Sequence, residues 1–260
     1  MPIYVAGIDI GGTKSLGVVL DEHGVVVAES RVPTPQGAEE LLNTVEALAE
    51  DLGNVVGELS AVGVGVPGLV TDDGLFRFAP NLTEVRELPV GSLLREHLNI
   101  PVVVDNDANA AAWAEHKAGA AVGVDHLVLI TLGTGIGTGV VLDGKIQRGA
   151  YGFAGELGHI IVDPDGAMCP CGRRGCWETL ASGGGLARMG RELVDSGRGN
   201  AILVLAGGDV ALIRGEHVTR AARRGDEDAL ALLKQLAWNI GLGLANVSAI
   251  LDPELVLLGG

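Results

Sequence analysis

The stretch Val5-Ala6-Gly7-Ile8-Asp9-Ile10-Gly11-Gly12-Thr13-Lys14 carries an acidic residue near the end of an apolar segment, directly before a glycine turn. Residues 3–10 and 14–20 have the apolar, β-branched composition of strands, so the turn between them predicts a hairpin. Gly24 would turn the chain again, into a third strand at 25–30. The chain is therefore expected to begin with a small β-meander.

The same plan occurs a second time further along the chain. Residues 126–132 have the pattern of a strand, 133–137 read Gly-Thr-Gly-Ile-Gly, and 138–142 have the pattern of a returning strand. Both returning strands end in Val-Val-Leu-Asp, at residues 18–21 and 140–143. We interpret the two hairpins as an internal duplication.

The two glycine turns are candidate phosphate-binding loops. Backbone amides in such turns can point at phosphate oxygens, and the hydroxyls of Thr13 and Thr134 add donors. The dinucleotide fingerprint and the Walker A loop are excluded, because both lead into a helix and these turns lead into strands. An ordinary hairpin turn would explain either copy alone. Two copies, with Asp9 placed to orient Mg²⁺-bound water, favour a site for ATP.

The composition predicts an α/β protein without nucleic-acid or membrane partners. Of the 260 residues, 47% are hydrophobic but only 3% aromatic, which favours aliphatic sheets covered by helices. The formal net charge of −15, without a basic run, excludes binding to a nucleic-acid backbone or an anionic membrane. With no signal peptide and no stretch long enough to span a bilayer, we expect a cytoplasmic protein.

Hydrophobic periodicity predicts alternating helices and strands in the rest of the chain. The length is sufficient for two lobes that each bury a core. We expect helices at 37–52, 93–98, 108–119, 184–196, 216–224 and 227–246, and strands at 60–66, 100–104 and 255–258.

Three cysteines and a histidine occur close together in the sequence, at Cys169, Cys171, Cys176 and His159. Three thiolates and one imidazole complete the tetrahedral shell of Zn²⁺, and the glycines between the cysteines allow the loop to double back. Because protein ligands fill every position, the pattern predicts a structural zinc. The alternative is a loop with three reduced cysteines.

Residues flanking this loop are candidate sugar ligands. Zinc would hold Glu156, Glu178 and the free ring nitrogen of His159 around one polar pocket, and two carboxylates with an imidazole suit sugar hydroxyls. Taken singly, each glutamate would be interpreted as a solvated surface residue.

Asn106 and Asp107 follow a buried strand, and the carboxyl ends of such strands are where open α/β sheets bind ligands. Asp107 is therefore a candidate general base for a sugar hydroxyl. The alternative is that Asp105 or Asp107 only caps the following helix. Asn81, in Ala79-Pro80-Asn81-Leu82, is either a hydroxyl ligand or a turn residue.

These motifs together resemble those of the ROK family of bacterial sugar kinases and repressors, over nearly the whole chain. The segments that carry the resemblance are Asp9-x-Gly-Gly-Thr-Lys14, Pro80-Asn81-Leu82, Asp105-Asn106-Asp107, Leu132-Gly-Thr-Gly-Ile-Gly137, Glu156-x-x-His159 and Cys169 to Glu178. The zinc loop is most similar to that of the family's glucokinases. The resemblance implies a two-lobed, actin-like ATPase fold (ribonuclease H-like), with a smaller lobe at 1–107 and a larger zinc-bearing lobe at 108–260.

The resemblance also implies an activity, the transfer of the ATP γ-phosphoryl group to the 6-hydroxyl of glucose, with Asp107 as the base. ATP, Mg²⁺ and a structural Zn²⁺ would be the cofactors, and a homo-oligomer, dimer or tetramer, is expected. The sugar would be held by Gly68, Asn81, Asn106, Glu156, His159 and Glu178. The phosphates would lie near Asp9, Gly11, Gly12, Thr13, Lys14, Gly133, Thr134 and Gly135. Zinc would take His159, Cys169, Cys171 and Cys176.

The resemblance leaves alternatives and shows one departure. Family members continue past the glycine run at Gly259, so we expect a missing C-terminal segment to weaken nucleotide binding and stability here. Other possible acceptors are N-acetylmannosamine, mannose and fructose. A sugar-responsive regulator is disfavoured by the acidic charge and by a first strand close to Met1, where regulators carry a helix-turn-helix. The third alternative is that the chain is an inactive sugar-binding fragment.

Overall fold

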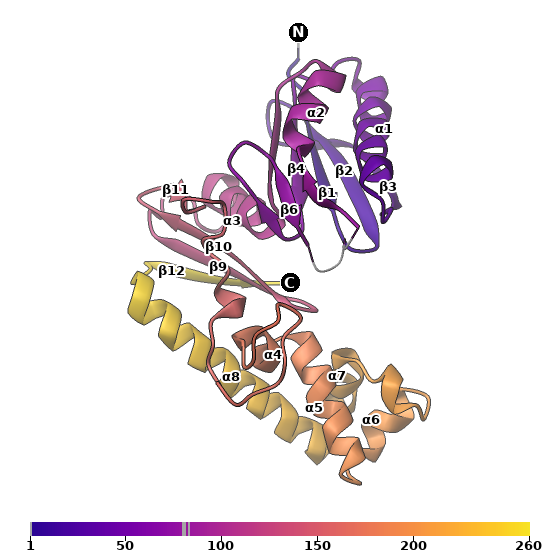
Figure 1. The fold of residues 1–260 in the computed structure, drawn as a ribbon, viewed down its shortest axis with the longest axis vertical. Helices are drawn as coiled ribbons and strands as arrows, with labels where there is room; N and C mark the ends of the chain where they lie inside the picture. Colours follow the sequence, from indigo (N-terminus) through magenta and orange to yellow (C-terminus); the bar gives the residue numbers. More distant parts are fainter. Residues whose placement is uncertain (1, 80–81, 83) are drawn as a thin grey trace. The chain divides into compact units, whose positions relative to one another are not determined.

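A computed structural model describes residues 2–79, 82 and 84–260, and the chain forms two compact units. Unit 1 comprises Met1–Gly119 and Ile146–Gly155, and unit 2 comprises Ala120–Lys145 and Glu156–Gly260. Each unit contains a mixed sheet with helices (Figure 1), which confirms the expected α/β class. The boundary expected after residue 107 lies inside unit 1, because helix α3 (Asp107–Ala118) packs on strands β4 and β8 of that unit.

The sheet of unit 1 has the strand order β3-β2-β1-β4-β8. Its strands are β1 (Val5–Ile10), β2 (Lys14–Leu20), β3 (Val26–Pro33), β4 (Ala61–Val66) and β8 (Val102–Asn106). The first three form the predicted antiparallel meander. Strand β4 pairs in parallel with both β1 and β8, so the carboxyl ends of these three strands lie at one edge of the sheet.

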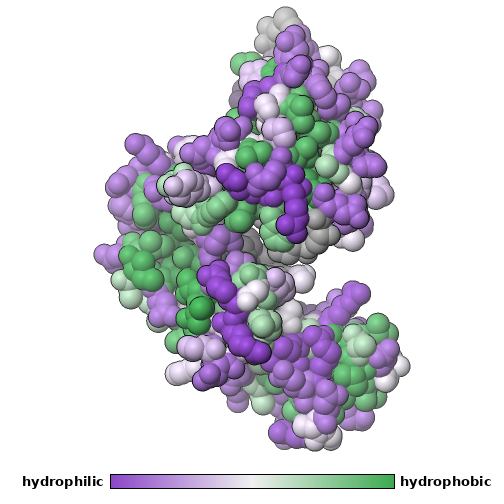
Figure 2. Space-filling view, viewed as in Figure 1, coloured by the Kyte–Doolittle hydropathy of each residue, from purple (hydrophilic) through white to green (hydrophobic). Residues whose placement is uncertain are grey.

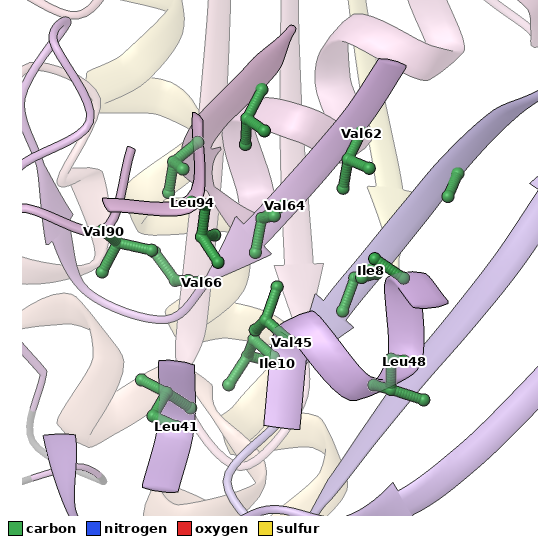
Figure 3. Packing of buried hydrophobic residues seen from close by; sticks show 14 of the residues in the cluster. Ile8, Ile10, Leu41, Val45, Leu48, Val62, Val64, Val66, Val90 and Leu94 are labelled. Atoms are coloured by element: carbon green, nitrogen blue, oxygen red, sulfur yellow. The ribbon is translucent and has the colours of Figure 1, made fainter. Parts of the chain in front are cut away.

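One face of this sheet forms the core of unit 1. Alternate side chains such as Ile8, Ile10 and Val64 are buried against helices α1 (Ala38–Val56) and α2 (Val90–Leu98), as Figure 3 shows. The period of two in the strands places the intervening residues on the opposite face. At the carboxyl ends of β1, β4 and β8 this face carries Asp9, Gly65 and Asp105.

Three short strands between β4 and α2 were not expected from the sequence. They are β5 (Leu69–Val70), β6 (Phe76–Phe78) and β7 (Arg86–Leu88), and they form a separate antiparallel sheet. Strands of two or three residues are too short to show an alternating pattern. Phe76 is fully buried and anchors this small sheet to the core.

The sheet of unit 2 repeats part of the plan of unit 1. Its order is β11-β10-β9-β12, with β9 (Leu127–Leu132), β10 (Ile136–Leu142), β11 (Lys145–Ile146) and β12 (Leu255–Gly259). Strand β9 pairs antiparallel with β10 and parallel with β12, as β1 pairs with β2 and β4. The shared topology supports the internal duplication seen in the sequence.

Helices make up most of the rest of unit 2. They are α4 (Trp177–Ala181), α5 (Gly183–Asp195), α6 (Asn200–Leu205), α7 (Gly215–Arg223) and α8 (Glu227–Leu251), with 3-10 turns η1 (Leu157–His159) and η2 (Val210–Leu212). Trp177 is buried between the sheet and α8, and its indole Nε1–H donates to the Asn239 carbonyl at 2.8 Å. Gly243 leaves room for this ring, since a Cβ there would stand 1.9 Å from it.

The surface of unit 2 is partly apolar. Figure 2 shows hydrophobic residues over the region of β12 and the C-terminal half of α8, where Ile250 and Leu258 are exposed. Strand β12 lies at the edge of its sheet. None of the helices in the described part of the chain is both long and apolar enough to cross a bilayer.

Candidate functional site

The first glycine turn, between β1 and β2, is held by backbone contacts. The Gly11 N–H donates to the Lys14 carbonyl at 3.0 Å, and a Cβ on Gly11 would stand 2.7 Å from that carbonyl oxygen. Thr34, just after β3, donates its hydroxyl to the Gly11 carbonyl at 2.7 Å and its N–H to the Thr13 carbonyl at 3.0 Å. Gly12, Thr13 and Lys14 are exposed, as a phosphate-binding turn requires.

The second glycine turn, between β9 and β10, is held by the start of α5. The N–H groups of Gly183 and Gly184 donate to the carbonyls of Gly133 and Thr134, both at 2.9 Å. A Cβ on either donor would stand 2.8 Å from the carbonyl oxygen it meets, so both positions need glycine. The turn closes on itself through the Gly133 N–H and the Gly135 carbonyl at 3.1 Å.

Glu178 supports this second turn. Its Oε2 accepts a hydrogen bond from the Ile136 N–H at 2.9 Å, and a Cβ on Gly135 would stand 2.4 Å from the same oxygen. The sequence predicted only a sugar ligand at this position. The structure adds a contact with the β9–β10 hairpin, made from the first turn of α4, which begins directly after Cys176.

Asn106 and Asp107 lie where β8 ends and α3 begins. Asn106 is the N-cap: its Oδ1 accepts from the N–H groups of Ala108 at 2.9 Å and Asn109 at 3.1 Å. Its Nδ2 donates to the Gly68 carbonyl at 2.9 Å. The Asp107 Oδ1 also accepts from the Ala108 N–H at 2.8 Å, so Asp107 shares the capping contacts of this helix with Asn106.

Gly68 shapes the loop that receives the Asn106 amide. Its φ of +85° lies in the region that favours glycine, and a Cβ there would stand 2.3 Å from the Phe78 carbonyl. The backbone of Gly68 therefore positions Asn106, and the predicted role of Gly68 as a sugar ligand stays a prediction.

The carboxyl group of Asp107 has a raised pKa. Residue 107 reaches solvent, yet desolvation by the surrounding atoms raises the pKa above 3.8, and the negative charge of Asp9 adds to the shift. Desolvation also raises the pKa of Asp9, which lies on an exposed position of β1. A carboxylate with a raised pKa at a strand end suits proton abstraction.

Two residues that sequence reasoning did not single out, Gly65 and Arg148, lie at this strand edge. Strand register places Asp9 of β1 opposite Gly65 of β4, and Gly65 opposite Asp105 of β8. The alternation Gly63-Val64-Gly65 in β4 was a usable signal, because it marks one sheet face as open. Arg148 contacts Asp105 from the segment Ile146–Gly155 and had no local signal.

The four predicted metal ligands converge in unit 2. One ligand atom from each of His159, Cys169, Cys171 and Cys176 lies within 4.8 Å of all the others. The Cys169 Sγ to His159 Nδ1 and Cys171 Sγ to Cys176 Sγ distances are both 3.6 Å. Tetrahedral Zn²⁺ with its usual bond lengths would separate ligand atoms by about 3.5 to 3.8 Å. The cluster therefore fits zinc.

The loop doubles back through glycine, as predicted. Gly175 has φ +66°, and a Cβ there would overlap the Asp163 carbonyl at 1.4 Å. Burial raises the pKa of the Cys169 thiol to about 12. Three thiolates this close need a cation to ionise together, which again fits a metal. With Nδ1 toward the cysteines, the Nε2 of His159 lies 3.9 Å from Glu156 Oε2.

The predicted site residues thus fall into two groups. In unit 1 the structure places Asp9, the first glycine turn, Gly68, Asn106 and Asp107; in unit 2 it places the second glycine turn, Glu156, Glu178 and the Cys₃His cluster. Asn81 lies outside the described residues. The groups available are two glycine turns, carboxylates at a strand end and polar side chains beside the Cys₃His cluster.

The chain is similar to known proteins in sequence and in fold. The sequence model of the ROK family matches residues 5–260. A glucokinase of Streptomyces coelicolor is 40% identical over 98% of this chain and 80% of its own length, and an N-acetylmannosamine kinase of Shigella flexneri is 36% identical over 98% and 82%. The crystal structure of a ROK family glucokinase from Streptomyces griseus in complex with glucose and AMPPNP superposes with a TM-score of 0.83 at 40% identity, covering 99% of this chain and 83% of that one.

Proposed function

Since the chain belongs to the ROK family, we propose that it is an ATP-dependent sugar kinase that transfers the γ-phosphoryl group to the 6-hydroxyl of glucose. Its relatives named glucokinase, and a neighbouring structure solved with glucose and AMPPNP, support this choice of donor and acceptor. The family match and the mixed sheets agree with the two-lobed, actin-like fold expected from the sequence.

The observation that carries the proposal is the Asp107 carboxylate. It lies at the carboxyl end of β8, its backbone is fixed by the Asn106 cap, and burial with Asp9 raises its pKa. As general base, Asp107 accepts the proton of the attacking hydroxyl and keeps it at its own carboxyl oxygen. Proton acceptance of this kind contributes roughly 10²- to 10⁴-fold to a rate.

Phosphate binding is assigned to the two glycine turns. In the turns at 11–14 and 133–135, amides other than those of Gly11 and Gly133, which bond within the turns, would donate to phosphate oxygens together with the hydroxyls of Thr13 and Thr134. Mg²⁺, when bound, neutralises phosphate charge, and the Asp9 carboxylate would orient its water ligands. The residues of the chain then act mainly by positioning, which is the dominant contribution in phosphoryl transfer.

The sugar ligands are proposed from the chemistry of individual side chains. Asn106, the Nε2 of His159 and the carboxylate of Glu156 would hold hydroxyls, with Gly68, Asn81 and Glu178 completing the proposed set. The Cys₃His cluster would hold a structural zinc through His159 Nδ1 and the three thiolates. With four protein ligands this metal has no open position, so its role is to fix the loop that carries His159 and Glu178.

A second acceptor is favoured by one observation. The N-acetylmannosamine kinase of Shigella flexneri is nearly as similar to this chain as the glucokinases are. Acceptor choice depends on differential contacts with the substituent at carbon 2, so it requires direct measurement.

The test is ADP release by the purified protein with ATP and Mg²⁺, across glucose, mannose, fructose, N-acetylglucosamine and N-acetylmannosamine. We expect glucose to be turned over with the highest kcat/KM. The matched control is Asp107→Asn, which should lose at least about 10²-fold in kcat while still binding glucose. A higher kcat/KM for N-acetylmannosamine would mean that this sugar, and not glucose, is the acceptor. Normal turnover by Asp107→Asn would show that Asp107 is not the general base. No turnover with any sugar would overturn the proposal.

A further inference from the structure

The segment Ile146–Gly155 belongs to unit 1 and places an arginine on the strand end that carries the candidate base. Both Nε and Nη2 of Arg148 donate to Oδ2 of Asp105, at 3.0 and 2.5 Å. The Asp105 side chain is only 13% exposed, whereas that of a second acid near the guanidinium, Asp72, is 74% exposed and 3.6 Å away. Asp105 is therefore the main partner of Arg148.

The other oxygen of Asp105 holds the residues on either side of Asp107. Its Oδ1 accepts from the backbone N–H of Asn106 at 2.8 Å and from Nδ2 of Asn109 at 3.2 Å. Asn106 and Asn109 are the N-cap and the third residue of α3. Asp107 is thus held between two residues that both donate to one carboxylate, and that carboxylate is fixed from the far side by Arg148.

We propose that Arg148 is a positioning residue for phosphoryl transfer, which acts through Asp105 to fix the Asn106–Asp107 turn. The inference rests on the proposed role of Asp107 as base. Without the guanidinium, Asp105 would be a largely buried carboxylate without its cation, and such a group turns toward water. This movement releases the donors at Asn106 and Asn109, and a small displacement of a catalytic group is enough to slow a reaction.

A different role for Arg148 would be to tether the segment 146–155 to unit 1. That segment has other anchors, however. Phe153 lies under the guanidinium of Arg77, 5.9 Å from ring centroid to carbon, and Gly152 packs so closely that a Cβ would stand 2.0 Å from the Val70 carbonyl. Arg77 contacts the same segment without touching Asp105, and its other partner is the exposed Glu87. Arg77→Met is therefore the matched control.

The experiment compares the wild type with Arg148→Met, Arg148→Lys, Asp105→Asn, the double variant Arg148→Met/Asp105→Asn and Arg77→Met. For each protein it measures kcat, the KM values for glucose and ATP, and the melting temperature. We expect Arg148→Met to lower kcat by roughly 10- to 100-fold and to raise the KM for glucose, because the released turn carries the proposed sugar ligand Asn106, while the KM for ATP stays within about twofold. Lys should restore part of the loss, since it keeps the charge but not the forked donors. The double variant should be no slower than Asp105→Asn alone, and Arg77→Met should keep the wild-type kcat.

A second measurement does not depend on turnover. Hydrogen exchange of the amides at 106–109 should become faster in Arg148→Met than in Arg77→Met at equal melting temperature. Wild-type kcat in Arg148→Met, an equal loss in Arg77→Met, additive losses in the double variant, or unchanged exchange at 106–109 would each overturn the proposal. A wild-type protein without sugar turnover would contradict the proposed function instead, and the exchange result would then decide the role of Arg148 by itself.

Discussion

The Cα atom of Asp107 lies 3.6 Å from the point that a Cβ atom on Gly65 would occupy, and Oδ1 of Asp9 lies 3.8 Å from the same point. These are ordinary van der Waals distances for one methyl group, but they leave no space for a branched side chain. Because Gly65 has no side chain, Asp9 and Asp107 can both lie beside it, and the negative charge of Asp9 raises the pKa of Asp107. The placement of the two carboxylates therefore requires a small residue at position 65.

Gly65→Val should lower kcat by about 10²-fold, because its γ-methyl groups would displace Asp107 or Asp9. Gly65→Ala should stay close to the wild type. The control is Gly63→Val, on the same strand and the same face, where the nearest atom to an added Cβ is the Ala6 carbonyl oxygen at 4.0 Å. Coupled assays and melting curves check this, and equal losses in the two valine variants would contradict it.

Features with local determinants could be predicted from the sequence. The two hairpins follow from glycine turns between β-branched segments, and the cluster of His159 with three cysteines follows from ligand types within one loop. Asp107 could be singled out because it follows a buried strand directly. The α/β class followed from the aliphatic composition, and the two-lobed, actin-like fold followed from the resemblance to the ROK family.

Features that depend on distant pairing could not be predicted in this way. Asp105 and Arg148 are 43 residues apart, and nothing near Arg148 in sequence indicates its partner. The importance of Gly65 can be recognised only from the strand register, which places it opposite Asp9 on one side and Asp105 on the other. The return of residues 146–155 to unit 1 is likewise a tertiary effect, so a division at a single point in the sequence could not describe the units.

The raised pKa of Asp107 predicts how activity depends on pH. The base must be ionised, so kcat/KM should fall as the pH decreases through a value above the ordinary 3.8. Asp9→Asn removes a negative charge that raises this pKa, so the acid limb should move to lower pH even if the plateau rate also falls. Desolvation is the larger cause and remains. A profile of kcat/KM against pH for both proteins tests this, and a limb that stays in place or moves up would refute it.

Removal of the metal should loosen the loop that joins His159 to α4. Cys176 is the N-cap residue of α4 and fully buried, so Cys176→Ser should lose zinc and lower the melting temperature by about 5 to 10 °C, or roughly 2 to 3 kcal/mol for a chain of this size. A chelator should destabilise the wild type but not the variant. Met168→Leu, at an exposed position in the same loop, is the control. Metal analysis that finds no zinc in the wild type would argue against the assignment.

Glu178 allows sugar binding and hairpin support to be separated. Glu178→Gln keeps an oxygen that accepts from the Ile136 N–H but loses the negative charge, so it should raise the KM for glucose with little effect on the KM for ATP. Glu178→Ala leaves that N–H without its partner, at a cost of about 1 to 3 kcal/mol, and should raise both KM values because the 133–135 turn loses its support. Glu192→Ala, at an exposed glutamate of α5 paired with Arg188, is the control and should change neither. If Glu178→Ala and Glu178→Gln raise only the KM for glucose, and by equal factors, Glu178 is a sugar ligand that the hairpin does not need. If only Glu178→Ala raises the KM for ATP, the hydrogen bond from the Ile136 N–H couples the loop of the three cysteines to nucleotide binding.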